Sequence, residues 1–188
     1  MQNDDQNETA YLERIKQGDV ASYSYFVEKY RDMALTISSR ILRREDDAMD
    51  ATQESFVKAF QQLSTFQRKS KFSTWFYTIV YRTALNKNRE NQLDLFRRNK
   101  YIADSDYLSI SESSSMNQLN EKSIKIINDA IGNLSKIDST LITLYYMNDS
   151  TIKELHEITG LSETNIKVRL FRARKKLEIE LKPLIQKD

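Results

Sequence analysis

Residues 101–120, with the sequence YIADSDYLSISESSSMNQLN, interrupt a chain that otherwise carries the pattern of helices. This stretch has six serines, few large aliphatic side chains and only acidic charges, which is the composition of a flexible linker. On both sides of it apolar residues recur at the i, i+3, i+4, i+7 spacing of amphipathic helices, without any strand or hairpin pattern. We therefore expect an all-α protein of two small helical domains, residues 10–98 and 121–188, joined by a flexible linker over 99–120 and preceded by a disordered tail over 1–9.

The composition excludes several classes of protein. A chain of 188 residues with three Gly, one Pro and no Cys is not collagen-like, low in complexity or held by disulfides, and it has no thiolate for a zinc or iron–sulfur site. No segment approaches the roughly 20 apolar residues of a membrane span, and the polar start MQNDDQNET lacks the apolar core of a secretion signal. We expect a cytoplasmic protein without membrane insertion, cofactor, metal or small-molecule substrate.

Charge is segregated along the chain although the net charge is only +2. Residues 1–63 carry 8 Lys and Arg against 12 Asp and Glu, residues 64–100 carry 9 against 2, and residues 162–176 carry 6 against 1. A uniformly solvated surface rarely sorts charge in this way. The two basic blocks favour a protein that touches one polyanion at two places.

Residues 151–177 have the pattern of a helix-turn-helix. A short helix ends at Gly160, whose access to positive φ suits a tight turn, and Ser162 can cap the helix that follows. At ~100° per residue, one side of that second helix is an apolar stripe, formed by Ile166, Leu170, Ala173 and Leu177. His156, the single histidine, is expected to pack where the two helices cross rather than to serve as a ligand or a base.

The outer side of this second helix is basic and is the candidate surface for duplex DNA. Together with Ser162, its residues are Thr164, Lys167, Val168, Arg169, Phe171, Arg172 and Lys175. Such a helix enters the major groove with basic side chains on phosphates, and an outward Phe171 could meet a thymine methyl group. The alternative is a helical hairpin whose charged face is merely solvated.

The segment DAMDATQESFVKAF carries an acidic stripe. Asp47, Asp50 and Glu54 fall within about 60° on a helical wheel, nearly opposite an apolar stripe, which contains Phe56, Ala59, Phe60 and Leu63. Three carboxylates on one face could form a metal site, a catalytic pair or a docking surface for a basic partner. Because the Glu-x-x-His pair of carboxylate metal bundles is absent, docking is the leading functional interpretation, beside ordinary solvated charge.

Aromatic and basic residues interleave over residues 66–89, FQRKSKFSTWFYTIVYRTALNKNR. A basic loop, residues 66–73, precedes a helix on which one stripe changes from apolar to basic along Trp75, Ile79, Arg82, Asn86 and Arg89. This pattern suits single-stranded nucleic acid, because bases stack on or insert beside aromatic rings while cations follow the backbone. Core packing of Trp75 is the competing interpretation for that ring.

These residues resemble the extracytoplasmic-function group of bacterial sigma factors, the promoter-reading subunits of RNA polymerase. The resemblance covers about Leu12 to Leu184 and is carried by DAMDATQESFVKAF, FSTWFYTIVYRTALN and TIKELHEITGLSETNIKVRLFRARKKL in that order. It implies a sigma-2-like helical bundle over 10–98 and a sigma-4-like helix-turn-helix domain over 121–188. It also implies two partners, core RNA polymerase and promoter DNA, and in many members an anti-sigma factor.

The resemblance assigns a role to each surface. Asp50, Gln53 and Glu54 occupy the family's DxxQE pattern, which docks on a coiled coil of the polymerase clamp, with Asp47 alongside. The residues at the minus-ten positions are Phe66, Arg68, Lys69, Ser70, Lys71, Arg82, Asn86 and Arg89, and the outer face of the last helix takes the minus-thirty-five element. The sequence departs from the family at Gln67-Arg68-Lys69, where an Arg-Gly-acid run is usual, and at Val168, where a small polar residue is frequent.

The expected function is therefore promoter recognition without catalysis. The protein would direct core polymerase by reading the minus-thirty-five duplex and capturing the melted minus-ten strand. One alternative is a DNA-binding regulator that works through its helix-turn-helix without polymerase. A second is a small helical enzyme that acts on nucleic acid through the carboxylates of residues 46–54.

Overall fold

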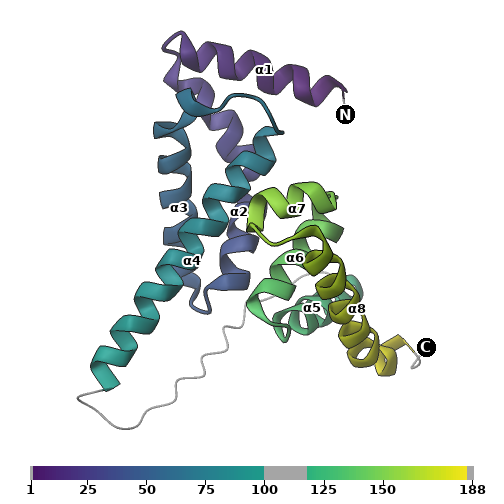
Figure 1. The fold of residues 1–188 in the computed structure, drawn as a ribbon. Helices are drawn as coiled ribbons and strands as arrows, with labels where there is room; N and C mark the ends of the chain where they lie inside the picture. Colours follow the sequence, from purple (N-terminus) through teal and green to yellow (C-terminus); the bar gives the residue numbers. More distant parts are fainter. Residues whose placement is uncertain (1, 100–117, 186–188) are drawn as a thin grey trace.

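The computed structural model describes residues 2–99 and 118–185, and these residues form helices and no strand (Figure 1). The first group of α-helices is α1 (Gln2–Lys16), α2 (Ser24–Ile41), α3 (Glu45–Gln61) and α4 (Phe72–Asn99), with short 3-10 turns at Val20–Tyr23 and Leu63–Thr65. The second is α5 (Gln118–Gly132), α6 (Lys136–Met147), α7 (Ile152–Thr159) and α8 (Glu163–Ile185). The prediction of an all-α fold with two helical domains is confirmed.

The first domain is built around aromatic rings that α2, α3 and α4 contribute to one core. Phe26 and Phe76 are fully buried. The ring centroids of Phe26 and Phe72 are 4.3 Å apart, and those of Phe56 and Phe76 are 4.6 Å apart. Each fully buried ring stabilises the fold by about 1.5–3 kcal/mol. This packing fixes the outer faces of α3 and α4, because it determines which side of each helix is turned to solvent.

Helix α1 begins at Gln2, so residues 2–9 are helical where the sequence predicts a disordered tail. Contacts with α2 explain the difference. Glu8 pairs with Lys29 at 2.8 Å and accepts a hydrogen bond from the Tyr30 hydroxyl, while Tyr11 stacks on Tyr25 with centroids 4.1 Å apart. These tertiary contacts hold a helix whose own sequence is too polar to predict one.

The second domain packs α6, α7 and the first half of α8 around aliphatic side chains. Leu141, Leu144, Leu155, Ile158 and Ile166 are each at most 2% exposed. α5 covers α8 and α6 from one side (Figure 1). The helix boundaries narrow the predicted linker: residue 99 ends α4 and residues 118–120 start α5, and the remainder of that linker lies outside the described residues.

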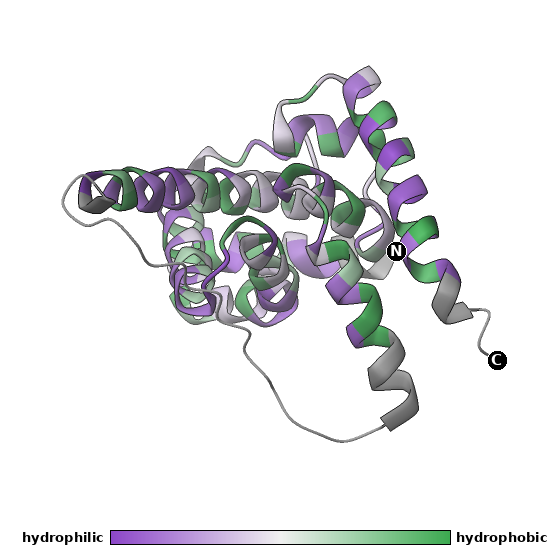
Figure 2. Ribbon diagram, turned by 90° about the horizontal axis from the view of Figure 1, so that it is seen from below, coloured by the Kyte–Doolittle hydropathy of each residue, from purple (hydrophilic) through white to green (hydrophobic). Residues whose placement is uncertain are grey.

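The two domains contact each other, which the sequence does not predict. α7 packs on α4 and α6 packs on α2 (Figure 1). α4 extends beyond this contact, and Figure 2 shows that its projecting end is mostly hydrophilic. Among the described residues, no helix combines the length and apolar character that crossing a membrane requires.

Candidate nucleic-acid interface and acidic face

The acidic face of α3, which we define as Asp47, Asp50, Gln53 and Glu54, is turned away from the core. The side chains of Asp50 and Glu54 are 67% and 50% exposed. The opposite side of the helix is buried through Ala48, Ala51, Thr52, Ser55, Phe56 and Ala59. The predicted separation of the carboxylate and core sides of this helix is confirmed, except that Phe60 of the expected core stripe remains 37% exposed.

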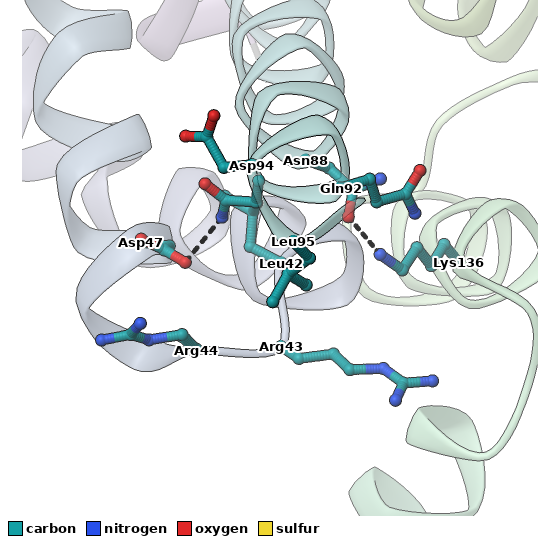
Figure 3. Close-up of a pocket in the computed structure, with 10 residues that line it drawn as sticks. Leu42, Arg43, Arg44, Asp47, Asn88, Gln92, Asp94, Leu95 and Lys136 are labelled. Atoms are coloured by element: carbon teal, nitrogen blue, oxygen red, sulfur yellow. Dashed lines mark hydrogen bonds between the residues drawn. The ribbon is translucent and has the colours of Figure 1, made fainter. Parts of the chain in front are cut away.

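Each carboxylate of the acidic face has a neighbour that orients it. Lys87 Nζ lies 2.9 Å from Asp50 Oδ2, and Lys58 Nζ lies 2.7 Å from Glu54 Oε1. Asn91 Nδ2 donates to Asp47 Oδ2 at 2.8 Å, at the edge of a cavity of about 430 Å³ (Figure 3). In the described part of the chain, no three His, Cys, Asp or Glu side chains gather as metal ligands would.

The basic loop ends at Lys71, because Phe72 already begins α4. Its residues Arg68, Lys69 and Lys71 are exposed, whereas Phe66 and Ser70 are partly buried. Arg68 has a φ of 55°, in the left-handed region that L-residues seldom adopt. Two cations of the loop are paired within the chain: Arg68 with Glu13 of α1 at 2.5 Å, and Lys71 with Glu154 of α7 at 2.8 Å.

Trp75 of α4 lies beside the basic loop. Its ring lies 5.1 Å from that of Phe66 and 5.5 Å from that of Phe72, measured between centroids, and the residue is partly exposed. Farther along α4, Arg82, Asn86 and Arg89 are all exposed. The predicted stripe therefore begins with an aromatic patch, the partly exposed rings of Phe66 and Trp75, and its exposed cations lie farther along α4.

The helix-turn-helix has its expected local structure. Thr151 and Glu154 form a capping box at the start of α7, and Gly160 ends this helix in the left-handed conformation with φ 73°. Asn165 N donates to Ser162 Oγ at 3.3 Å, which is the predicted cap of α8. His156 Nδ1 lies 2.7 Å from the carbonyl oxygen of Leu161, so this imidazole fastens the turn.

The outer face of α8 is exposed as predicted, with one exception. The exposed residues of this face are Thr164, Lys167, Val168, Phe171, Arg172 and Lys175. Phe171 is 54% exposed, and Lys175 Nζ lies 6.0 Å from the centroid of its ring. Arg169 is turned toward α6 instead, where its Nη1 lies 2.8 Å from Asp138 Oδ1. On the other side of α8, Ile166, Leu170 and Ala173 are buried.

Sequence reasoning missed the acidic partners of the cations. Glu13 lies 55 residues before its partner Arg68, and Glu154 lies 83 residues after its partner Lys71. Glu154 was recognisable as part of a Thr-x-x-Glu capping box, but nothing in that motif indicates a second contact with Lys71. No periodicity links such residues, since periodicity reports only the face within one helix.

Both halves of the chain match known families. Residues 26–93 match Sigma-70 region 2, and residues 124–177 match Sigma-70, region 4. The chain is 29% identical over 182 residues to the ECF RNA polymerase sigma-E factor of Haemophilus influenzae, covering 94% of this chain and 96% of that protein. It is 25% identical over 179 residues to the ECF RNA polymerase sigma factor SigW of Bacillus subtilis, covering 92% and 96%.

Solved structures agree at the level of the fold. The sigma factor RpoE of Bartonella quintana, solved with the anti-sigma factor NepR, gives a TM-score of 0.68 at 19% identity over 87% of this chain and 98% of that chain. CnrH, solved with the cytosolic domain of CnrY, gives 0.63 at 18% identity over 94% and 98%.

A helical domain with an acidic and an aromatic–basic face, followed by a helix-turn-helix domain, defines the sigma-70 class of promoter-recognition subunit. Within this class, the chain belongs to the extracytoplasmic-function family of RNA polymerase sigma factors.

Proposed function

We propose that this sigma factor uses three surfaces, each for a different binding role. The acidic face docks on core RNA polymerase, the basic loop and the exposed stripe of α4 hold the melted minus-ten strand, and the outer face of α8 reads the minus-thirty-five duplex. One observation carries the proposal. The polar residues assigned to these surfaces on α3, α4 and α8 are turned to solvent, while the other side of each helix is buried through residues such as Phe56, Phe76 and Ile166.

Docking through the acidic face follows from its charge and its support. Asp50 and Glu54 project from a rigid helix, and each is held by one lysine and remains at least half exposed. A basic partner surface can replace these weak surface pairs, since an exposed ion pair contributes only ~0.2–1 kcal/mol. Such electrostatic complementarity steers association and fixes the register of the two surfaces.

Strand capture depends on the aromatic patch and on the loop that borders it. Extruding a base costs a few kcal/mol, and stacking on an aromatic ring returns ~1–3 kcal/mol per base. Phe66 and Trp75 supply ring surface, and Lys69 and Arg82 supply charge for the backbone. The melted state is then stabilised by binding alone, without any catalytic step by this chain.

Joining two modest binding sites in one chain raises the occupancy of both. Once one domain is bound, the other is held near its element at a high effective concentration. This mode of action places the protein with the polymerase in the cytoplasm. By analogy with RpoE and CnrH, we also propose that an anti-sigma factor binds this chain.

Charge reversal on the acidic face tests the proposal. Asp50→Lys and Glu54→Lys should each abolish co-purification with core polymerase and transcription from a genomic fragment library. Asp32→Lys on α2 is the matched control, because Asp32 is exposed and, among the described residues, its carboxylate pairs only with its neighbour Arg31. Wild-type activity of both acidic-face variants would refute docking through this face.

The same experiment separates the alternatives. A polymerase-independent regulator would bind specific duplexes tightly as the isolated chain, and charge reversal at Asp50 would leave that binding unchanged. A nucleic-acid enzyme would show metal-dependent cleavage or transfer that Asp47→Asn and Asp50→Asn remove. Transcription that requires core polymerase excludes both as the main activity.

A further inference from the structure

A polar cavity of about 430 Å³ lies where the two domains meet (Figure 3). It is bordered by the turn between α2 and α3, by residues 88–95 of α4 and by Lys136, the first residue of α6. The cavity is large enough for a small organic ligand, whereas a single phosphate ion would fill only part of it. The proposed function leaves this space unused, although Asp47 of the acidic face lies at its edge.

One end of the cavity concentrates positive charge. Arg43 is exposed and forms no ion pair with another described residue, and Arg44 beside it reaches Asp46 only at 4.0 Å. Lys136 is partly buried, and its hydrogen-bond partner is the amide of Asn88 rather than a carboxylate. Burial lowers the pKa of Lys136, and the positive charge of Arg43 lowers it further. Two like charges that are held close together without a counter-ion favour a bound anion.

The two carboxylates that line the cavity have partners of their own. Asp47 accepts a hydrogen bond from Asn91 at 2.8 Å, and Figure 3 shows it on the opposite side of the cavity from Lys136. Asp94 Oδ1 lies 3.5 Å from Arg97 Nη1. The cavity therefore has a cationic end and an end with a carboxylate. This polarity suits a ligand that is anionic at one end and offers hydrogen-bond donors at the other.

The wall that α4 contributes is rich in amides. The side chains of Asn88, Asn91 and Gln92 all line the cavity. An amide both donates and accepts hydrogen bonds, as the edge of a nucleobase does. Leu42 and Leu95 add apolar surface on which the face of a ring can lie. Cations, amides and an apolar wall together match the phosphates, the base edge and the base face of a nucleotide.

The cavity is distinct from the surface proposed for the minus-ten strand. At ~100° per residue, Asn88 and Asn91 lie at least about 100° around α4 from the cations assigned to that strand. Those cations are Arg82 and Arg89. The cavity also includes Lys136 of the second domain, so it belongs to neither DNA-binding surface alone. These positions favour a soluble nucleotide over a DNA strand.

We propose that this cavity binds a soluble nucleoside diphosphate, with its phosphates at Arg43 and Lys136 and its base along the amides of α4. The existence of this site does not depend on the proposed function, but its consequence does. Asp47 belongs both to the cavity and to the acidic face that docks on core polymerase. A bound nucleotide therefore lowers the affinity for core polymerase, and core polymerase lowers the affinity for the nucleotide by the same factor.

Fluorescence anisotropy with the full-length chain tests the site. The probes are the N-methylanthraniloyl derivatives of ADP, GDP, CDP and UDP, of which at least one should bind with a dissociation constant below ~100 μM. The unlabelled nucleotide should displace its probe, whereas pyrophosphate and the nucleoside should each compete at least about tenfold less well, because each lacks part of the contacts.

Three results would overturn the proposal. One is the absence of binding for all four probes up to ~1 mM protein. Another is displacement by pyrophosphate as efficient as by the nucleotide, which would define a plain phosphate site. The third is displacement by a single-stranded oligonucleotide at lower concentration than by the nucleotide, which would make a DNA strand the occupant.

Two variants separate the phosphate end from the base end. Arg43→Met keeps the length of the side chain without its charge and should lower the nucleotide affinity at least tenfold. Gln92→Leu should lower the nucleotide affinity about two- to fivefold and leave the competition constant of pyrophosphate unchanged. Arg31→Met is the matched control, because Arg31 is exposed and, among the described residues, pairs only with Asp32.

The variants also show what contradicts the assignment. Wild-type affinity of Arg43→Met, with an unchanged circular dichroism spectrum, would overturn the phosphate position. An equal loss of nucleotide and pyrophosphate binding in Gln92→Leu would overturn the placement of the base along α4.

Titration of core polymerase tests the consequence. A saturating concentration of the nucleotide should weaken core binding by wild type about fivefold or more and should have less effect on Arg43→Met. Nucleotide binding without any change in core affinity would overturn the coupling, whereas the site would stand. A chain that does not associate with core polymerase under any condition would refute the proposed function, and the anisotropy result would still decide whether the cavity binds nucleotide.

Discussion

Replacing Phe171 with alanine tests whether α8 reads bases with an apolar contact. Phe171 is 54% exposed and lies outside the buried stripe of α8, so the change leaves the core intact. A phenylalanine presents roughly 200 Å² of surface, which leaves about 100 Å² open here. If DNA covers half of that, at ~25 cal/mol per Å², the contact stabilises the specific complex by about 1.3 kcal/mol, close to tenfold in affinity.

The assay compares two promoter fragments that differ only in a scrambled minus-thirty-five element, with holoenzyme assembled from core polymerase. Phe171→Ala should reduce the preference for the intact element about tenfold, and Phe171→Leu should retain part of it. Lys175→Ala should weaken both complexes alike and lower the salt slope by ~0.9, because it removes one phosphate contact. Equal losses on both fragments for Phe171→Ala would refute its placement at base edges.

Three further predictions concern local structure. Gly160→Ala should destabilise the second domain by ~1–2 kcal/mol in thermal melts, because φ is 73° there and an alanine is strained in that conformation. Space is not the reason, since no atom lies within 4 Å of the added Cβ. Gly132→Ala, where the added Cβ also has open space, is the control and should destabilise the domain less. Burial raises the pKa of Tyr30, so its contribution to stability is complete below pH ~10 and is lost progressively as the pH rises above that value. The difference in unfolding free energy between wild type and Tyr30→Phe, followed by circular dichroism, should therefore shrink above pH ~10, and a difference that does not change with pH would contradict this. Glu13→Gln removes the ion pair with Arg68 and should increase the affinity of the holoenzyme for a single-stranded minus-ten oligonucleotide up to about fivefold. Fluorescence anisotropy of the oligonucleotide measures this affinity. A lower affinity would show that Glu13 positions Arg68 for binding rather than restrains it.

The helix-turn-helix was the most predictable part of the molecule. Its cap at Ser162, its turn at Gly160 and its buried stripe through Ile166 and Leu170 all follow from local chemistry and from the 3.6-residue period. The exposure of Phe171 also followed from the 3.6-residue period of this helix. These features depend on neighbours within one or two turns, which is the range over which sequence patterns carry information.

Other expectations were wrong because distant contacts decide them. The N-terminal residues are helical because Glu8 and Tyr11 contact residues of α2 that lie at least 14 positions later in the sequence. Phe60 belongs to the predicted apolar stripe of α3 but remains 37% exposed, since the edge of a stripe is buried only where another helix covers it. Periodicity identifies the apolar side of a helix, but it does not show how much of that side the neighbouring helices cover.

The charge pattern illustrates the same limit in the functional surfaces. Counting Lys and Arg in residues 64–100 and 162–176 predicts two sites for a polyanion, and exposed cations are present on both. Yet Lys71 pairs with Glu154 of the second domain, and Arg169 pairs with Asp138 within its own domain. Each cation that reaches a phosphate contributes ~0.9 to the salt slope of DNA binding, so cations held within the chain do not count until their partners release them. The number of charges available to promoter DNA is thus a property of the tertiary structure, which local patterns in the sequence do not supply.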